Sequence, residues 1–140
     1  MKRIFLIACV KKKQAIPAKA RELYTSPLFR LSLCYAEKQH PDAIYILSAK
    51  HGLVELNQIL EPYEQTIIGK NKQVLQAWGE KVKGQLEKKA NLQKDQFVFL
   101  AGEKYQQALR PYILNYENPL QGLGLGKRLK FLKGQISNVK

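Results

Sequence analysis

The segment Ile4-Phe5-Leu6-Ile7-Ala8-Cys9-Val10 is a continuous apolar run near the start of the 140-residue chain. Basic residues bound it, with Lys2 and Arg3 before it and Lys11 after it. A strand that is covered on both faces has no alternation of polar and apolar side chains, because neither face meets water. The run therefore predicts a buried strand in the interior of a parallel sheet.

The segments on either side of this strand alternate between strand and helix signals. Further strands are expected at residues 43–47, 97–101 and within 111–116. Helices are expected from Ser26 to His40, from Asn71 to about Lys89, at 103–109 and in a basic C-terminal segment. Residues 11–25 and 53–70 show no such pattern and are expected as irregular loops.

This order predicts the fold class. Parallel strands need crossover connections, and the intervening helices supply them. We expect a single three-layer α/β domain over residues 1–140, with a mostly parallel central sheet of about four strands flanked by helices.

The charge is strongly basic, with 24 Lys and Arg against 11 Asp and Glu and a formal net charge of +13. Such a field attracts the phosphate groups of nucleic acids and nucleotides. The alternative interpretation is that the lysines serve solubility alone. Nucleic acid or a purine-like nucleobase or nucleotide is the expected partner.

The cysteine pattern and the hydropathy exclude several protein classes. Cys9 and Cys34 are far apart, without a CxxC motif or matching histidine pairs, so neither a zinc site nor a disulfide framework is indicated. We expect no metal and no other cofactor, and we expect Cys34 in the core. No run approaches the roughly 18 apolar residues of a membrane span, and a cytoplasmic location is expected.

Polar or glycine residues stand at the carboxyl ends of three predicted strands. They are Cys9 with Lys11 and Lys13, the segment Ser48-Ala49-Lys50-His51-Gly52, and Gly102 with Glu103. In open parallel sheets, ligands bind beyond the carboxyl ends of the strands. The topology therefore predicts that these segments converge on one site.

The Ser48 to Gly52 segment offers the most varied chemistry. Ser48 and Lys50 could donate to an anion, and His51 could move a proton near neutral pH. Gly52 could take a positive φ or let a ligand approach the backbone closely. The alternative is an ordinary polar turn.

Other candidates surround this segment in the predicted site. Glu61 and Tyr63 could read and stack a planar heterocycle. The charges of Lys11 and Lys13 would favour a nucleophilic thiolate at Cys9, although a free cysteine often only packs. Three more candidates, Arg21, Tyr24 and Ser26, lie just before an expected helix. The free backbone amides at the start of a helix bind phosphate groups. Ser26 also fits the helix N-cap.

The motifs ACVKKK (8–13), PAKARELYTSPLF (17–29), ILSAKHGLV (46–54), EPYEQTI (61–67), FLAGEKY (99–105) and PLQGLGLGKRL (119–129) together resemble an uncharacterised bacterial and phage domain family of unknown function. More distantly, they resemble the YaaA-type peroxide-stress proteins and the catalytic domain of archaeosine synthase. The residues that match are Cys9, Lys13, Tyr24, Ser26, Ser48, Gly52, Leu53, Val54 and Tyr63. Ala8 and Phe29 depart from the pattern, which has a proline and a histidine there. The resemblance implies a sheet of the uracil-DNA-glycosylase type and a link to modified purines or damaged DNA.

Two functional hypotheses follow. In the first, the protein acts on or binds a nucleobase or nucleotide, free or within nucleic acid, and could be a base-modification enzyme. Cys9, Lys50 and His51 would then carry the chemistry, while Tyr24 and Tyr63 pack the ring. In the second, it is a non-catalytic DNA- or RNA-binding protein in stress response or phage defence, which uses the loop at 11–21 and the basic helix at 127–133. Catalysis and oligomeric state are left open by the sequence.

Overall fold

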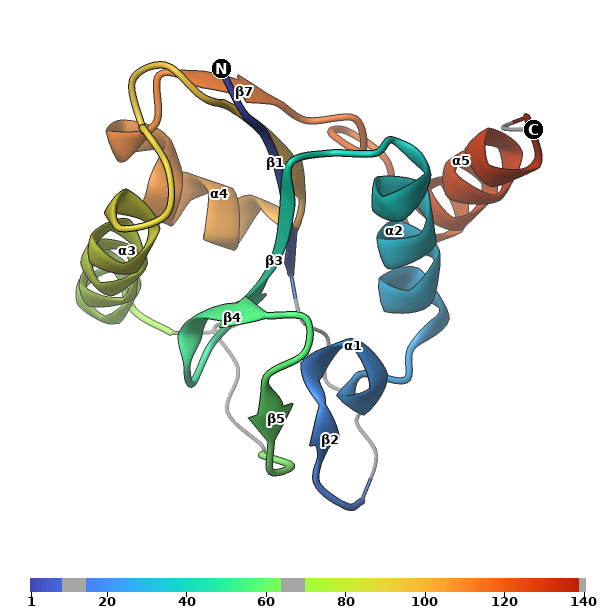
Figure 1. Ribbon diagram of the computed structural model, residues 1–140, viewed down its shortest axis with the longest axis horizontal. Helices are drawn as coiled ribbons and strands as arrows, with labels where there is room; N and C mark the ends of the chain where they lie inside the picture. Colours follow the sequence, from blue (N-terminus) through green and yellow to red (C-terminus); the bar gives the residue numbers. More distant parts are fainter. Residues whose placement is uncertain (9–14, 64–69, 139–140) are drawn as a thin grey trace.

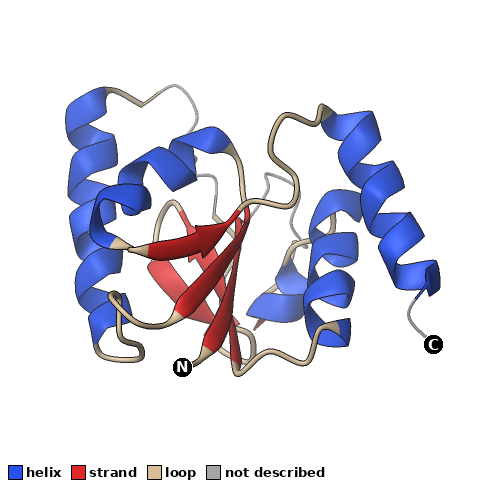
Figure 2. Ribbon diagram, turned by 90° about the horizontal axis from the view of Figure 1, so that it is seen from above, coloured by secondary structure: helices blue, strands red, loops and turns tan. Residues whose placement is uncertain are grey.

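The computed structural model describes residues 1–8, 15–63 and 70–138 of the chain. A five-stranded sheet with the order β4-β3-β1-β6-β7 forms its centre. Helices α2 and α5 cover one face of this sheet, and α3 and α4 cover the other (Figures 1 and 2). The expected α/β class and the mostly parallel sheet flanked by helices are confirmed.

Strand β1 (Arg3–Ala8) lies in the middle of the sheet, as its apolar run predicts. It pairs in parallel with β3 (Ala43–Ser48) on one side and with β6 (Gln96–Leu100) on the other. Because β1 is covered on both faces, residues 4–7 are almost completely buried. Strand β7 (Asn115–Glu117) extends the parallel part beyond β6. It is shorter than expected, because Arg110–Tyr112 forms a 3-10 helix that contains Pro111.

Strand β4 (Gly52–Glu55) is the antiparallel edge of the sheet and was not expected from the sequence. Its register with β3 pairs Ser48 with Gly52, so the chain reverses within residues 49–51. Gly52 has a φ of +78°, which glycine adopts without steric cost. The prediction of an irregular segment over residues 53–70 was wrong for residues 53–55, since Leu53 and Val54 are buried in this hairpin. Residues 64–69 of that segment lie outside the described residues.

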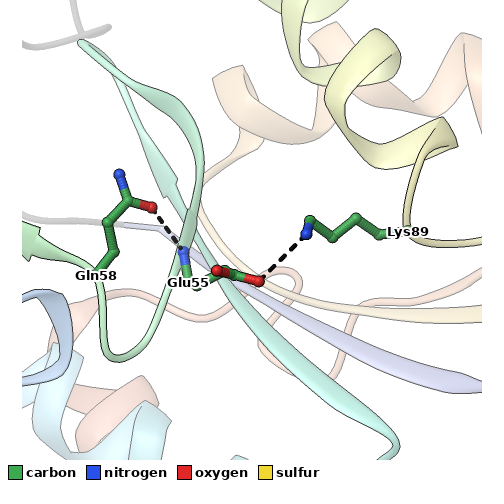
Figure 3. A network of polar contacts seen from close by, with 3 residues as sticks. All are labelled: Glu55, Gln58 and Lys89. Atoms are coloured by element: carbon green, nitrogen blue, oxygen red, sulfur yellow. Dashed lines mark hydrogen bonds and ion pairs between the residues drawn. The ribbon is translucent and has the colours of Figure 1, made fainter.

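Side-chain amides cover the outer edge of β4. Gln58 Oε1 accepts a hydrogen bond from the backbone N–H of Glu55 at 3.4 Å, and Lys89 Nζ lies 3.2 Å from the Glu55 carboxylate (Figure 3). Gln85 Oε1 accepts from the N–H of Leu53 at 2.9 Å. An edge strand whose amides are occupied is a poor template for another strand.

A second, two-stranded sheet lies beside α1 (Figure 1). It consists of β2 (Ala18–Lys19) and β5 (Ile59–Leu60) in antiparallel pairing. Helix α1 (Ala20–Leu23) follows β2 directly. The expectation of irregular loops was wrong here also, because pairings of two residues are too short to produce a periodic pattern.

The main helices match the sequence expectations. Their bounds are Pro27–Lys38 for α2, Lys72–Glu87 for α3, Glu103–Leu109 for α4 and Leu125–Asn138 for α5. Ser26 Oγ caps α2 by accepting from the N–H of Phe29 at 3.1 Å, and Asn71 Oδ1 caps α3. Cys34 on α2 is half-buried, so the expectation that it lies in the core was wrong.

The core divides into two clusters, one on each face of the sheet. Alternate residues of β1 belong to different clusters: Phe5 and Ile7 face α2 and α5, whereas Ile4 and Leu6 face α3 and α4. Within the described residues, no helix is both long and apolar enough to cross a membrane.

Candidate functional site

The carboxyl ends of β3 and β6 lie at one edge of the sheet, because both strands run parallel to β1. Ser48 ends β3, and Gly102 precedes α4 just after β6. Cys9, Lys11 and Lys13 lie outside the described residues, so their part in a shared site stays a prediction. The site is therefore built from the segments that follow β3, β5 and α1.

Three buried hydroxyl groups form a chain at this edge. Tyr63 Oη lies 2.7 Å from Ser48 Oγ and 2.5 Å from Tyr24 Oη. The residues come from the end of β3, from the position after α1 and from the segment after β5. Each hydroxyl can donate once and accept as well. The chain thus joins three segments that are distant in the sequence.

The three members of this hydroxyl chain are buried. Tyr24 and Ser48 are 0% exposed and Tyr63 is 7% exposed. Their hydroxyl groups bond one another within the protein, and the expectation that Tyr24 and Tyr63 stack a planar ligand stays a prediction. Ser48 Oγ also accepts from the backbone N–H of His51 at 3.1 Å, which ties the hydroxyl chain to the turn between β3 and β4.

His51 is the half-buried residue at the top of this turn. Its ring contacts the Tyr63 ring edge-on, with centroids 5.3 Å apart and planes at 90°. Burial lowers the pKa of His51, and the positive charges of Lys50 and Lys81 lower it further. A neutral imidazole is the form that can accept a proton near neutral pH.

Lys50 and Lys81 place two ammonium groups beside this imidazole. Lys50 is exposed, and its Nζ lies 5.9 Å from the centre of the Tyr63 ring. Lys81 reaches the turn from α3 and donates to the Lys50 carbonyl at 3.1 Å. The turn therefore combines a proton acceptor with positive charge that attracts anions.

Gly52 has the positive φ that the sequence suggested, but the group that approaches it closely is a protein side chain. A Cβ at this position would lie 2.3 Å from Gln85 Oε1. Gln85 uses the space to bond the backbone on both sides of Gly52. Gly52 thus shapes the turn.

The remaining candidates are Arg21, Ser26, Glu61 and Gly102. The Arg21 guanidinium is ion-paired with Glu37 of α2 at 2.8 Å, and Ser26 caps that helix. Glu61 is exposed, two residues before Tyr63. Gly102 has no atom within 4 Å of the position where a Cβ would stand, so a side chain would fit there.

Sequence reasoning missed the contribution of α3. Trp78, Lys81 and Gln85 all bond the turn, whereas the helical pattern marked Trp78 only as a core residue. A signal was available, because positions 78, 81 and 85 lie on one helix face. Polar side chains next to a buried tryptophan on that face indicate a polar target on the neighbouring strand.

No group of three or more His, Cys, Asp or Glu side chains in residues 1–8, 15–63 and 70–138 could hold a metal ion.

Comparison with known proteins gives a family but no curated relative. The model of DUF6884, described as a family of unknown function, matches residues 4–134. No curated protein matches the chain.

Proposed function

The chain belongs to DUF6884, and we propose that it acts on or binds a nucleobase or nucleotide, free or within nucleic acid, at the turn between β3 and β4. In this proposal His51 accepts or donates a proton, and Lys50 contacts an anionic group. The observation that carries it is the half-buried His51, held edge-on against Tyr63 with two lysines beside it.

The electrostatics favour an anionic ligand that needs proton transfer. Two ammonium groups attract a phosphate, and they lower the pKa of His51 in addition to the larger effect of burial. Once an anion offsets these charges, the pKa of His51 rises, so that protonation becomes easier. Binding and proton uptake would thus reinforce each other.

The buried hydroxyl chain supports this proposal by fixing the turn. A proton-transfer group must be held within hydrogen-bond reach of its target. The backbone of His51 is bonded by Ser48, which in turn bonds Tyr63. The ring of His51 contacts that same tyrosine.

The hydroxyl chain also bears on the more distant resemblance. Tyr24, Ser48 and Tyr63, three of the residues on which the resemblance to YaaA-type proteins and archaeosine synthase rests, are the ones that share the hydroxyl chain. Their contact supports the proposal that the protein is a base-modification enzyme. A cytoplasmic location, where nucleotides and nucleic acids are found, is part of the same proposal.

The two histidines of the chain provide a matched test. His51→Asn removes the imidazole from the turn, whereas His40→Asn makes the same change at an exposed residue with a φ of +51° beyond α2. Thermal unfolding should be followed with purine bases, 7-deazaguanines and nucleoside monophosphates. A ligand that stabilises the wild type and His40→Asn but not His51→Asn supports the proposal. Equal stabilisation of all three proteins contradicts it.

A specific observation favours a second candidate, which is non-catalytic binding of DNA or RNA. Helix α5 contains four basic residues and no acidic one, and Lys127, Lys130 and Lys133 are exposed on it. Phosphate contacts make the logarithm of the binding constant fall with the logarithm of salt, with a slope of about −0.9 per contact on duplex DNA. This candidate predicts a steep slope in a salt titration of duplex DNA binding. Lys-to-Gln changes on α5 should reduce that slope, and His51→Asn should leave it unaffected.

A further inference from the structure

One face of α3 holds the backbone of the turn that carries His51. Trp78 Nε1 donates to the Ser48 carbonyl at 2.8 Å. Lys81 Nζ donates to the Lys50 carbonyl at 3.1 Å. Gln85 Nε2 donates to the His51 carbonyl at 3.2 Å, and Gln85 Oε1 accepts from the Leu53 N–H at 2.9 Å. These four hydrogen bonds join α3 to the backbone of residues 48–53.

The spacing of these residues explains how a single helix reaches along the turn. Positions 78, 81 and 85 are separated by three and four residues, so their side chains follow one another along the same helix face. Residues 48–53 run beside this face, and the order of the contacts is the same in both segments: Trp78 meets Ser48, and Gln85 meets His51 and Leu53.

Helix α3 is itself firmly packed. Val82 and Leu86 are completely buried against the sheet. At Gly79 a Cβ would lie 2.4 Å from the Ala108 carbonyl oxygen, so α3 and α4 are in close backbone contact there. Trp78 also contacts Tyr105 of α4, with ring centroids 5.3 Å apart. The three side chains therefore project from an element that has little freedom to move.

His51 is the turn residue on which the restraints converge. Its N–H donates to Ser48 Oγ, and its carbonyl accepts from Gln85 Nε2. Both backbone polar groups of His51 are thus bonded to side chains, and these come from two different elements. Its ring is placed against Tyr63. A hairpin needs no such restraint to close, whereas a residue that transfers protons needs a fixed position.

We propose that Trp78, Lys81 and Gln85 are positioning residues that hold the Ser48–Leu53 turn so that His51 presents its imidazole in one orientation. This inference rests on the proposed function of His51, although the positioning can be tested without any ligand. Lys81 has a second effect, because its charge lies close enough to influence the protonation of His51.

Two substitutions separate these effects. Gln85→Met keeps the length of the side chain and removes both of its hydrogen bonds. Lys81→Met removes a hydrogen bond and a positive charge. Lys83→Met is the matched control, because Lys83 lies on the same helix but pairs with Glu87 and lies over the Tyr112 ring.

Amide hydrogen exchange and NMR titration of the His51 ring are the measurements. In Gln85→Met, exchange at the Leu53 amide should rise by about tenfold relative to the amides of α3, and the His51 ring resonances should shift as the contact with Tyr63 loosens. In Lys81→Met, the pKa of His51 should rise, and in Lys83→Met both readouts should stay at the wild-type value.

The inference is overturned if Gln85→Met leaves Leu53 exchange and the His51 resonances unchanged, or if Lys83→Met alters them as much as Lys81→Met does. These readouts are made on the free protein. A failure of nucleotides to bind would therefore count against the proposed function, while the positioning role would be decided separately by exchange and titration.

Discussion

Replacing Gly52 by alanine tests the geometry of the turn most sharply. The residue has a φ of +78°, and an added Cβ would lie 2.3 Å from Gln85 Oε1 and 3.4 Å from Val82 Cγ2. The left-handed conformation costs an L-residue about 1–2 kcal/mol. Displacing Gln85 also loses its bonds to Leu53 and His51, each worth about 1 kcal/mol. We expect Gly52→Ala to lower the free energy of unfolding by about 3–4 kcal/mol.

A double-mutant cycle separates the two parts of this cost. Gln85→Ala alone should cost about 2 kcal/mol, because it removes the same two hydrogen bonds. In Gly52→Ala/Gln85→Ala the clash is gone, so the double variant should be about as unstable as Gly52→Ala alone, with a coupling of about 2 kcal/mol. Equilibrium unfolding in urea measures all four proteins.

Gly84→Ala is the control for the Gly52 substitution. Gly84 lies in the middle of α3, and no atom lies within 4 Å of the position of its Cβ. Alanine is favoured over glycine in a helix interior by about 1 kcal/mol, so this variant should be more stable than the wild type. A cost below about 0.5 kcal/mol for Gly52→Ala, or additive costs in the cycle, would refute the reasoning about Gln85.

Three further predictions concern protonation and the anchoring of the fold. Since the pKa of His51 is lowered in the folded state, the unfolded chain takes up a proton at higher pH than the folded protein does. The stability that neutral His51 contributes should therefore be fully present above about pH 6.5 and be lost as the pH falls through the folded pKa. Urea unfolding between about pH 7.5 and pH 5 should show a weaker dependence of the unfolding free energy on pH in His51→Asn than in His40→Asn. The Asp95 carboxylate accepts from the N–H groups of Lys2 and Asn91, both at 2.8 Å, so Asp95→Ala should cost about 3 kcal/mol of unfolding free energy, and a cost below about 1 kcal/mol would show that these bonds are replaced by water. Ser26→Ala removes the N-cap of α2 and should cost about 1 kcal/mol, measured in the same way, whereas an unchanged stability would mean that another group caps the helix.

Much of the fold follows from the sequence because it depends on local patterns. The apolar run that begins at Ile4 could be assigned to the sheet centre, where residues 3–8 form β1, since a strand covered on both faces lacks alternation. Helix α2 begins at Pro27 because Ser26 is a strong cap, and both features are visible in the sequence. The edge strand β4 was missed because its reversal at Gly52 depends on a bond pattern with Gln85, 33 positions further along the chain.

The site was predictable only in part. The position of Ser48 at a strand end followed from topology, and the chemistry of His51 followed from residue type. The contact of Ser48 and Tyr24 with Tyr63 joins residues that are 15 and 39 positions apart, and no periodicity records such a contact. The burial of Tyr24 and Tyr63 could not be seen in the sequence either, because a tyrosine is found both in cores and at binding surfaces.

The most direct test of the central claim is a map of NMR chemical-shift changes on isotope-labelled protein as purine bases and nucleoside monophosphates are added. We predict shift changes that centre on residues 48–53 and on the His51 ring, with a rise in the pKa of His51 when a phosphate-bearing ligand binds. These changes should be lost in His51→Asn but not in His40→Asn. Changes confined to α5, or a saturable response that leaves the turn and the pKa of His51 unaltered, would contradict it.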